Sequence, residues 1–213
     1  MAENSSAATI AGIYGRLVRV FGTQEILLVG GSAMILTSEP GRQLKDIDLA
    51  VEPARLYGIP RELAEQEGFR PGFDGSRLIE LEDMATGIEV EASSKSCGNL
   101  NSKLGIPPYT EQRPTIIGLP LIDVISRAER IELNGARMCI PSREDQVLMK
   151  YNLWKFRGEG RTRMQKDADD ISKIVRFYYR GVDAFLEMRG SIEPRVIGTW
   201  AAFEANMRAI CQG

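Results

Sequence analysis

Histidine is absent from this chain of 213 residues. Without histidine, the chain can form neither a Ser-His nor a Cys-His nucleophile pair, and the common histidine-containing zinc sites are excluded. Catalysis would have to depend on carboxylates, lysines, hydroxyls or a bound metal ion. A bound Mg²⁺ can stabilise a transferring phosphoryl group without help from a histidine.

Cysteine is scarce, and no long apolar run occurs. The three cysteines, Cys97, Cys139 and Cys211, are widely spaced. This fits neither an even disulfide framework nor a Cys-x-x-Cys zinc site, so we expect inert thiols. No apolar stretch approaches the roughly 20 residues of a membrane helix, and the first residues lack the basic and then apolar pattern of a signal peptide. We therefore expect a cytoplasmic protein without a membrane partner.

Charge is nearly balanced but unevenly distributed. The net charge of −2 argues against a surface coated for nucleic acid. Residues 62–91 carry nine Asp/Glu against two Arg, whereas residues 150–166 carry six Lys/Arg against one Glu. Both runs are compatible with solvated faces. Alternatively, the basic run lines a nucleotide or acceptor cleft, and the acidic run faces solvent.

Hydrophobic periodicity predicts an α+β fold, in which a small mixed sheet is backed by helices and followed by a helical C-terminal region. We expect a core over residues 1–140, a helical region over 141–213, and a loop or boundary at 93–120, which is rich in Ser, Gly, Asn and Pro. The expected helices cover residues 9–21, 32–36, 60–67, 142–157, 164–179 and 196–210, and the expected strands cover 26–29, 46–51, 77–81, 87–92 and 137–140.

The most informative residues are Gly30-Gly31-Ser32, which follow an apolar run, and the pair Asp46 and Asp48. Side chains two residues apart on a strand share a face, about 6–7 Å from one another. Two like charges there are costly unless a divalent cation binds between them. The glycine turn could serve packing alone, or it could let backbone approach a phosphate. In the second case, a branched side chain at Gly31 would block the phosphate and disfavour a positive φ.

Two further glutamates could complete a metal site. Glu89 and Glu91 alternate with Ile88 and Val90, so the two carboxylates share one face of an expected strand. Such alternation is equally typical of an amphipathic strand with one wet face.

Charged residues also occur on apolar helix faces. Lys150 falls within or beside the apolar stripe of its helix, and Asp167 falls on the stripe of the next helix. A buried charge must be paired, hydrogen-bonded or bound to a ligand, so these two residues either pair with each other or contact a ligand. Lys166, Asp169 and Asp170 are expected to lie more outward.

The Gly-Ser turn followed by Asp-x-Asp resembles the motif of the DNA polymerase β superfamily of nucleotidyltransferases. Thirteen residues separate Ser32 from Asp46, a slightly longer gap than is usual in that motif. The resemblance implies an enzyme that binds a nucleoside triphosphate with one or two Mg²⁺ ions, transfers the nucleotidyl group to an acceptor and releases pyrophosphate. It assigns metal binding and catalysis to Asp46, Asp48 and Glu89, with Glu91 in reserve, and triphosphate binding to the Gly30-Gly31-Ser32 turn.

A second match lies downstream. The segments 141–150 and 166–171 are similar to the pattern of toxin-type nucleotidyltransferases from abortive-infection systems. This likeness implies a tRNA or a protein hydroxyl as acceptor, an antitoxin as partner, Lys150 on the triphosphate and a catalytic role for Asp167. A small-molecule acceptor such as an aminoglycoside is the alternative for an enzyme. The other alternative is a catalytically silent nucleotide-binding or antitoxin-like module.

Overall fold

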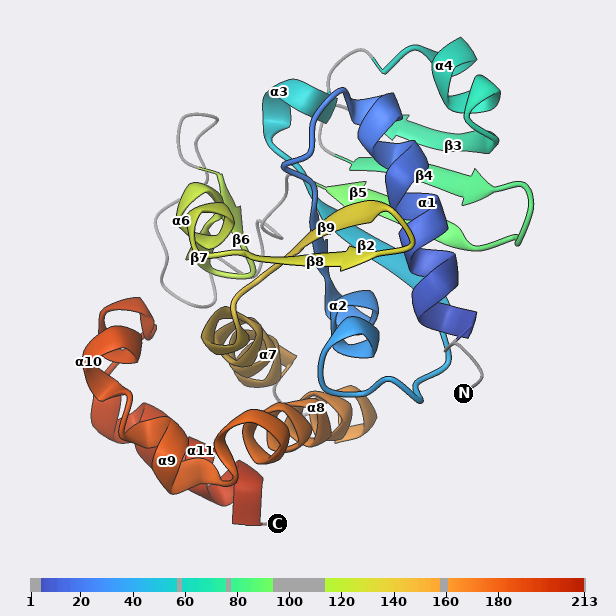
Figure 1. Cartoon of the computed structure of the whole chain (residues 1–213). Helices are drawn as coiled ribbons and strands as arrows, with labels where there is room; N and C mark the ends of the chain where they lie inside the picture. The colour runs from blue at the N-terminus through green and yellow to red at the C-terminus, as the bar shows by residue number, and fades with distance from the viewer. Residues whose placement is uncertain (1–4, 57–58, 76–77, 94–113, 158–160, 213) are drawn as a thin grey trace. The chain divides into compact units, whose positions relative to one another are not determined.

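The computed structural model describes residues 5–56, 59–75, 78–93, 114–157 and 161–212. The chain forms two compact units (Figure 1). Of the described residues, unit 1 comprises 5–56, 59–75, 78–93, 114–115 and 120–142, and unit 2 comprises 116–119, 143–157 and 161–212. No helix of the described chain has the length and apolar character needed to cross a membrane.

Unit 1 contains a mixed sheet and short helices. Its helices are α1 (Ser5–Phe21), α2 (Gly30–Leu36), α3 (Pro53–Leu56), α4 (Arg61–Gln66) and α6 (Leu121–Ser126). Its strands are β1 (Leu27–Val29), β2 (Asp46–Ala50), β3 (Phe69–Gly75), β4 (Leu78–Asp83), β5 (Glu89–Ser93), β8 (Glu129–Leu133) and β9 (Ala136–Ile140). The unit boundary runs through a small hairpin of β6 (Thr115–Ile116) and β7 (Leu119–Pro120).

Unit 2 is helical. It contains α7 (Arg143–Arg157), α8 (Arg161–Tyr179), α9 (Val182–Leu186), α10 (Arg189–Ile192), a 3-10 turn at Glu193–Arg195, and α11 (Trp200–Gln212). A cluster of aromatic rings, which includes Tyr151, Phe185 and Phe203, fills part of its interior. The helical character predicted for the last third of the chain is therefore confirmed.

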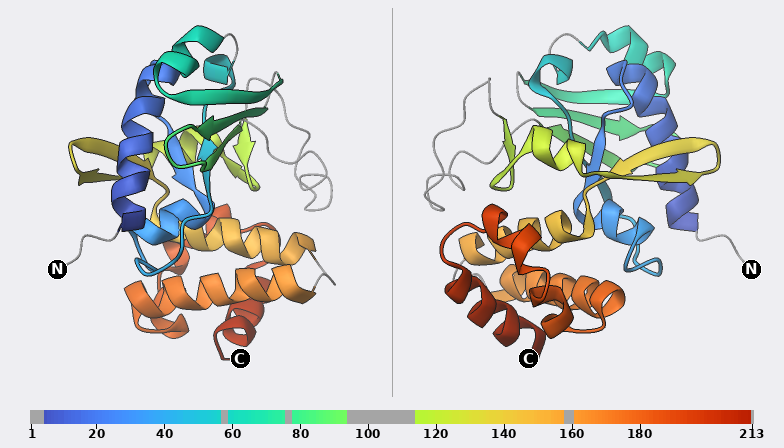
Figure 2. Two further views of the ribbon diagram at one scale, coloured as in Figure 1. Left: turned by 90° about the vertical axis from the view of Figure 1, so that its right-hand side faces the viewer. Right: turned by 60° about the vertical axis from the view of Figure 1, so that its left-hand side comes forward.

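Within the described residues the sheet of unit 1 has the strand order β3-β4-β5-β2-β1-β9-β8. Strand β2 is antiparallel to β1 and parallel to β5, and β1 is parallel to β9, so the sheet is mixed as predicted. Helix α1 lies across one face of it (Figures 1 and 2). Residues Ile10, Ile13 and Leu17 of α1 recur at helical spacing and are buried in one apolar core with alternate residues of the strands.

A buried tyrosine supports the sheet where its ladder is short. Strands β1 and β9 share only the residue pair Leu27 and Cys139. The Tyr14 hydroxyl from α1 donates to the carbonyl oxygen of Ile26 at 2.7 Å and accepts from the backbone N–H of Cys139 at 3.3 Å. Burial and the neighbouring Cys139 thiol raise the pKa of Tyr14, so its hydroxyl stays protonated. Tyr14 thereby bridges the two strands.

Several elements were missed by the sequence analysis. Strand β3 contains Pro71 and Gly72 and shifts its register against β4 between Pro71 and Asp74, which removes the regular alternation of a strand. The predicted loop 93–120 includes the hairpin β6–β7, and α6 begins directly after it. Residues 94–113 of that predicted loop lie outside the described residues.

A buried ion pair connects α1 to the end of β4. Asp83 is completely buried, and its carboxylate lies 2.7 Å from the guanidinium of Arg16 and accepts a hydrogen bond from the Thr86 hydroxyl at 2.5 Å. Arg16 also donates to the carbonyl oxygen of Glu67 at 3.2 Å. Burial raises the pKa of Asp83, but the hydrogen bonds from Arg16 and Thr86 outweigh that effect and hold the pKa below its usual value.

This ion pair predicts a dependence of stability on pH. A carboxyl group whose pKa is lowered by folding contributes its full stabilisation above the unfolded pKa of about 3.9, and loses it as the pH falls through the folded pKa. Arg16→Met should destabilise the protein by about 3 kcal/mol near neutral pH, because it leaves a buried carboxylate without its counter-ion. It should also weaken the loss of stability below pH 4. Urea unfolding across the acid range measures both effects.

Arg19→Met is the matched control, since Arg19 is an exposed arginine of the same helix that pairs with Glu67. It should leave the free energy of unfolding almost unchanged. Equal losses in the two variants would contradict a special role of the Arg16–Asp83 pair.

Candidate active site

The predicted carboxylates come together on one face of the sheet in unit 1. Strand β2 pairs with β5 so that Asp46 lies beside Glu89 and Asp48 lies beside Glu91. Residues paired in this way project to the same side of a sheet, and neighbouring strands lie about 4.7–4.9 Å apart. The intervening residue Ile47 is completely buried in the apolar core. Both candidates for a third carboxylate therefore flank the aspartate pair.

The next strand extends this acidic face. Glu82 of β4 lies beside Glu89, and Glu80 lies beside Glu91. Arg70 of β3 lies beside Glu82 and donates to it from Nε at 3.2 Å. A hollow of about 610 Å³ over these strands is lined by the two aspartates, the four glutamates and Arg70. We call these six carboxylates, of residues 46, 48, 80, 82, 89 and 91, the acidic face. The acidic segment 62–91 was expected to face solvent, but four of its glutamates line this hollow.

Gly30 makes room for one member of the acidic face. Strand β1 places Val29 beside Asp48, and Gly30 follows at the start of α2 with a φ of +62°. A Cβ atom on Gly30 would lie 2.3 Å from Oδ2 of Asp48. A positive φ was expected at Gly31, and this was wrong: the left-handed backbone conformation occurs one residue earlier, at Gly30.

The next two residues of the turn have protein contacts of their own. Ser32 is 1% exposed, and its hydroxyl donates to the carbonyl oxygen of Val29 at 2.8 Å. The guanidinium of Arg42 lies against Gly31, since its Nε would be 3.5 Å from a Cβ placed there. The Ser32 hydroxyl could donate to a phosphate only after giving up its hydrogen bond to the carbonyl oxygen of Val29.

The acidic face has ligands of the type that Mg²⁺ prefers, but they do not converge. Carboxylate oxygens suit this ion. Across the parts of the chain that the structure describes, no group of three or more His, Cys, Asp or Glu side chains is arranged to hold a metal ion. Side chains of the acidic face would have to turn toward a common point before one ion could contact three of them.

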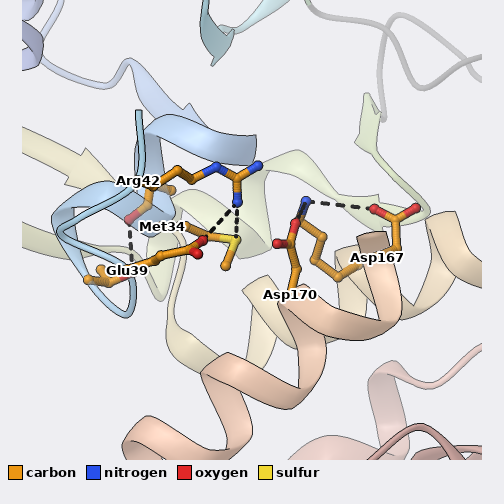
Figure 3. Close-up of polar contacts among 8 residues, drawn as sticks. Met34, Glu39, Arg42, Asp167 and Asp170 are labelled. Atoms are coloured by element: carbon orange, nitrogen blue, oxygen red, sulfur yellow. Dashed lines mark hydrogen bonds and ion pairs between the residues drawn. The ribbon is translucent and has the colours of Figure 1, made fainter. Parts of the chain in front are cut away.

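Lys150 and Asp167 lie in unit 2, where they take part in a buried ion-pair network. The Lys150 ammonium lies 2.6 Å from Oδ2 of Asp170 and 3.7 Å from Oδ1 of Asp167. The exposed fractions of the side chains are 12% for Lys150, 1% for Asp167 and 3% for Asp170. Both aspartates project from α8 (Figure 3). The expectation that Asp170 lies outward was wrong, and Asp170 is the nearer partner of Lys150.

Sequence reasoning missed Arg42, Arg70 and Asp170. Arg42 lies in the connection between α2 and β2, where no periodicity marks which side chains point inward. Arg70 lies on β3, the strand whose pattern is interrupted by a proline and a glycine. Asp170 follows Asp169 directly, and only tertiary packing decides which of two adjacent aspartates faces the interior. The one available signal was the spacing of Asp167 and Asp170, three residues apart and so on one helix side.

Known proteins resemble this chain in structure but not in sequence. The sequence matches no protein-family model and no curated protein. Among solved structures, the fold is similar to that of an antigenic nucleotidyltransferase-like protein from Paracoccidioides brasiliensis, with a TM-score of 0.52, 16% identity, and coverage of 93% of this chain and 97% of that chain. JHP933 from Helicobacter pylori is less similar, with a TM-score of 0.47, 12% identity, and coverage of 97% of this chain and 90% of that chain. The likeness to the Paracoccidioides brasiliensis protein shows that this chain shares the fold of a nucleotidyltransferase-like protein.

The two glycines provide a matched test of the turn. Gly30→Ala should destabilise the protein by about 1–2 kcal/mol, the usual cost of left-handed backbone for an L-residue, and should displace the Asp48 carboxylate. Gly31→Ala is the control, because its Cβ would meet Arg42 only at the ordinary contact distance of 3.5 Å. Urea unfolding compares the two variants, and equal losses of stability would contradict the assignment of the strained position to Gly30.

The Lys150 network yields a second test. Lys150→Met should lower the free energy of unfolding by about 3–5 kcal/mol, because two buried carboxylates lose the cation they share. Adding Asp170→Asn should recover more of this loss than adding Asp167→Asn, since Asp170 is the nearer partner. Urea unfolding of the single and double variants measures the difference. A Lys150→Met protein of wild-type stability would mean that the network does not stabilise unit 2.

Proposed function

We propose that this protein is a Mg²⁺-dependent nucleotidyltransferase, which moves a nucleotidyl group from a nucleoside triphosphate to an acceptor hydroxyl and releases pyrophosphate. The observation that carries the proposal is the strand register that sets Asp46 beside Glu89 and Asp48 beside Glu91. Four carboxylates in adjacent positions repel one another, and a divalent cation relieves that repulsion. The nucleotidyltransferase-like fold supports the same reaction class.

The proposed metal ligands are Asp46, Asp48 and Glu89, with Glu91 as the alternative third carboxylate. One or two Mg²⁺ ions bound there would neutralise charge on the triphosphate and lower the pKa of the attacking hydroxyl. The side chains do not converge on one point, which fits an ion that takes its remaining ligands from substrate phosphates and water. Binding of Mg²⁺ should therefore be weak alone and stronger together with the nucleotide.

The remaining proposed roles come from the resemblance in the sequence. Gly30, Gly31 and Ser32 would bind the triphosphate, with Gly31 offering a surface without a side chain. Lys150 would contact the triphosphate, and Asp167 would act near the metal or the attacking hydroxyl. The ion pairs of Lys150 with Asp170 at 2.6 Å and with Asp167 at 3.7 Å favour a stabilising role for that lysine. The ligand role of Lys150 and the catalytic role of Asp167 stay predictions.

The acceptor is proposed from the toxin-type pattern alone. A tRNA end or a protein side-chain hydroxyl is the first candidate, and an antitoxin would be the regulating partner. A small molecule such as an aminoglycoside is the second candidate. A silent nucleotide-binding or antitoxin-like module is the rival from another class, and it predicts binding of triphosphate without release of pyrophosphate.

Asp48→Asn tests the proposed reaction. The change is nearly isosteric, so the fold should be kept, and the loss of one negative charge relieves repulsion within the acidic face. Transfer of label from the α-phosphate of each nucleoside triphosphate to tRNA or protein, in the presence of Mg²⁺, should fall by at least about a hundredfold, the scale of losing one charge-stabilising group. Pyrophosphate release should fall in parallel.

Glu132→Gln is the control, since Glu132 is an exposed carboxylate on β8, away from the acidic face. It should transfer label at the wild-type rate. Wild-type transfer by Asp48→Asn would refute the catalytic role of Asp48. A wild-type protein that binds triphosphate, yet releases no pyrophosphate with any acceptor tried, would favour the silent module.

A further inference from the structure

The outer side of α8 in unit 2 carries a row of exposed cations. Lys166, Asp169, Lys173 and Arg176 recur at intervals of three and four residues, so they share one side of the helix. All four residues are exposed. Asp169 is the single acid of this row, and its carboxylate accepts a hydrogen bond from Gln165 at 2.9 Å. At a rise of 1.5 Å per residue, the row is about 15 Å long. This side of α8 is therefore basic, although the whole chain is not.

Two of these cations have no carboxylate partner in the part of the chain that the structure describes. Lys166 and Arg176 form no ion pair there. By contrast, Arg195 and Arg208 of the same unit both pair with aspartates. Lys166 and Arg176 can therefore contact an anionic ligand without first giving up an ion pair within the described residues.

An exposed aromatic ring adjoins the row. Phe177 follows Lys173 by one helical turn and is 59% exposed. Its ring lies edge-to-face against Tyr178, with a distance of 4.9 Å between the ring centroids, so one contact within the protein fixes its position. An exposed apolar ring gains free energy when a ligand covers it. Cations beside a ring suit a single-stranded nucleic acid, whose phosphates bind the cations and whose bases stack on the ring.

A hollow of about 460 Å³ also adjoins the row, between α7, α8 and α11. Its lining includes Trp154 of α7 and Ile210 of α11, and Arg176 belongs both to this lining and to the row. The Trp154 ring stacks on Tyr151, with 5.8 Å between the ring centroids. The volume lies within the usual range for sites that bind small organic groups. The hollow could therefore take a nucleobase next to the cations.

We propose that this side of α8 binds single-stranded RNA. Lys166 and Arg176 contact phosphates, Phe177 stacks on one base, and the hollow beside Trp154 takes another. A duplex would fit poorly, because the faces of its bases are hidden by stacking. RNA fits better than DNA, because folded RNA presents unpaired bases in its loops and ends. In making RNA the acceptor class, this inference rests on the proposed function, but the binding itself requires no turnover.

The experiment is fluorescence anisotropy with a labelled, unpaired RNA of about 12 nucleotides, at about 50 to 200 mM salt and without nucleoside triphosphate. The double variant Lys166→Gln/Arg176→Gln should bind this RNA about ten- to hundredfold more weakly. Its plot of log affinity against log salt should be shallower by about 1.4, because each phosphate contact to a single strand contributes about 0.7 to the slope.

Phe177 tests stacking separately from charge. Phe177→Ala should weaken RNA binding about five- to hundredfold, the scale of losing one stacked base, and should leave the salt slope unchanged. Phe177→Tyr keeps an aromatic ring and should bind RNA as the wild type does. Wild-type affinity in Phe177→Ala would overturn the proposed face, since the ring would then not contact the RNA.

Arg19→Gln/Arg61→Gln is the control with the same change in net charge. Both arginines are exposed in unit 1, where they pair with Glu67 and Glu65. This variant should keep the wild-type affinity and salt slope. Equal losses in the two double variants would overturn the inference, since net charge alone would then explain them. Tighter binding of single-stranded DNA, or equal competition by poly-glutamate, would overturn the assignment to RNA.

The outcomes also distinguish this inference from the proposed function. If the protein transfers label to a protein or a small molecule but does not bind RNA, the inference is wrong and the proposed function stands. If RNA binds through Lys166, Arg176 and Phe177 while no pyrophosphate is released with any acceptor, the RNA-binding face stands and the proposed reaction is wrong. A protein that neither binds RNA nor releases pyrophosphate would contradict both.

Discussion

The parallel pairing of β2 with β5 is the constraint on which the candidate site depends. It sets like charges side by side, an arrangement that is unfavourable by itself. The register is nevertheless fixed, because a slip by one residue would turn buried residues such as Ile47 and Val90 toward the acidic side. The apolar core between the sheet and α1 therefore holds the carboxylates together against their repulsion. A cation bound at this face would recover electrostatic free energy that the fold alone does not.

The glycine turn and the acidic face form one local system in unit 1. Gly30 accommodates the Asp48 carboxylate, and Gly31 accommodates the Arg42 guanidinium. A Cβ atom at Gly30 would displace the Asp48 carboxylate, whereas a Cβ atom at Gly31 would only touch the Arg42 guanidinium at ordinary contact distance. Opposite charges therefore lie near the start of α2, and both are positioned by short-range contacts within the unit. The buried network of Lys150, Asp167 and Asp170 serves unit 2 in a different way, by joining α7 to α8.

Much of the acidic face could be predicted from the sequence, because strand periodicity alone puts Asp46 with Asp48 and Glu89 with Glu91. Their pairing across strands could not, since it depends on a parallel contact between segments separated by about forty residues of chain. Helix stripes indicated correctly that Lys150 and Asp167 face inward, but two adjacent aspartates left the choice of Asp170 to tertiary packing. Strand β3 and Arg42 were missed for a common reason: proline, glycine and loop residues carry no period.

The central claim is that the acidic face binds a divalent cation together with a nucleoside triphosphate. Anomalous X-ray scattering from Mn²⁺, in crystals grown with a non-hydrolysable nucleoside triphosphate, tests it most directly, because Mn²⁺ replaces Mg²⁺ at oxygen ligands. The account predicts an anomalous peak within coordination distance of the Asp46 and Asp48 carboxylates, shared with phosphate oxygens. Nucleotide density with no Mn²⁺ peak at these aspartates, or a peak elsewhere on the molecule, would contradict it.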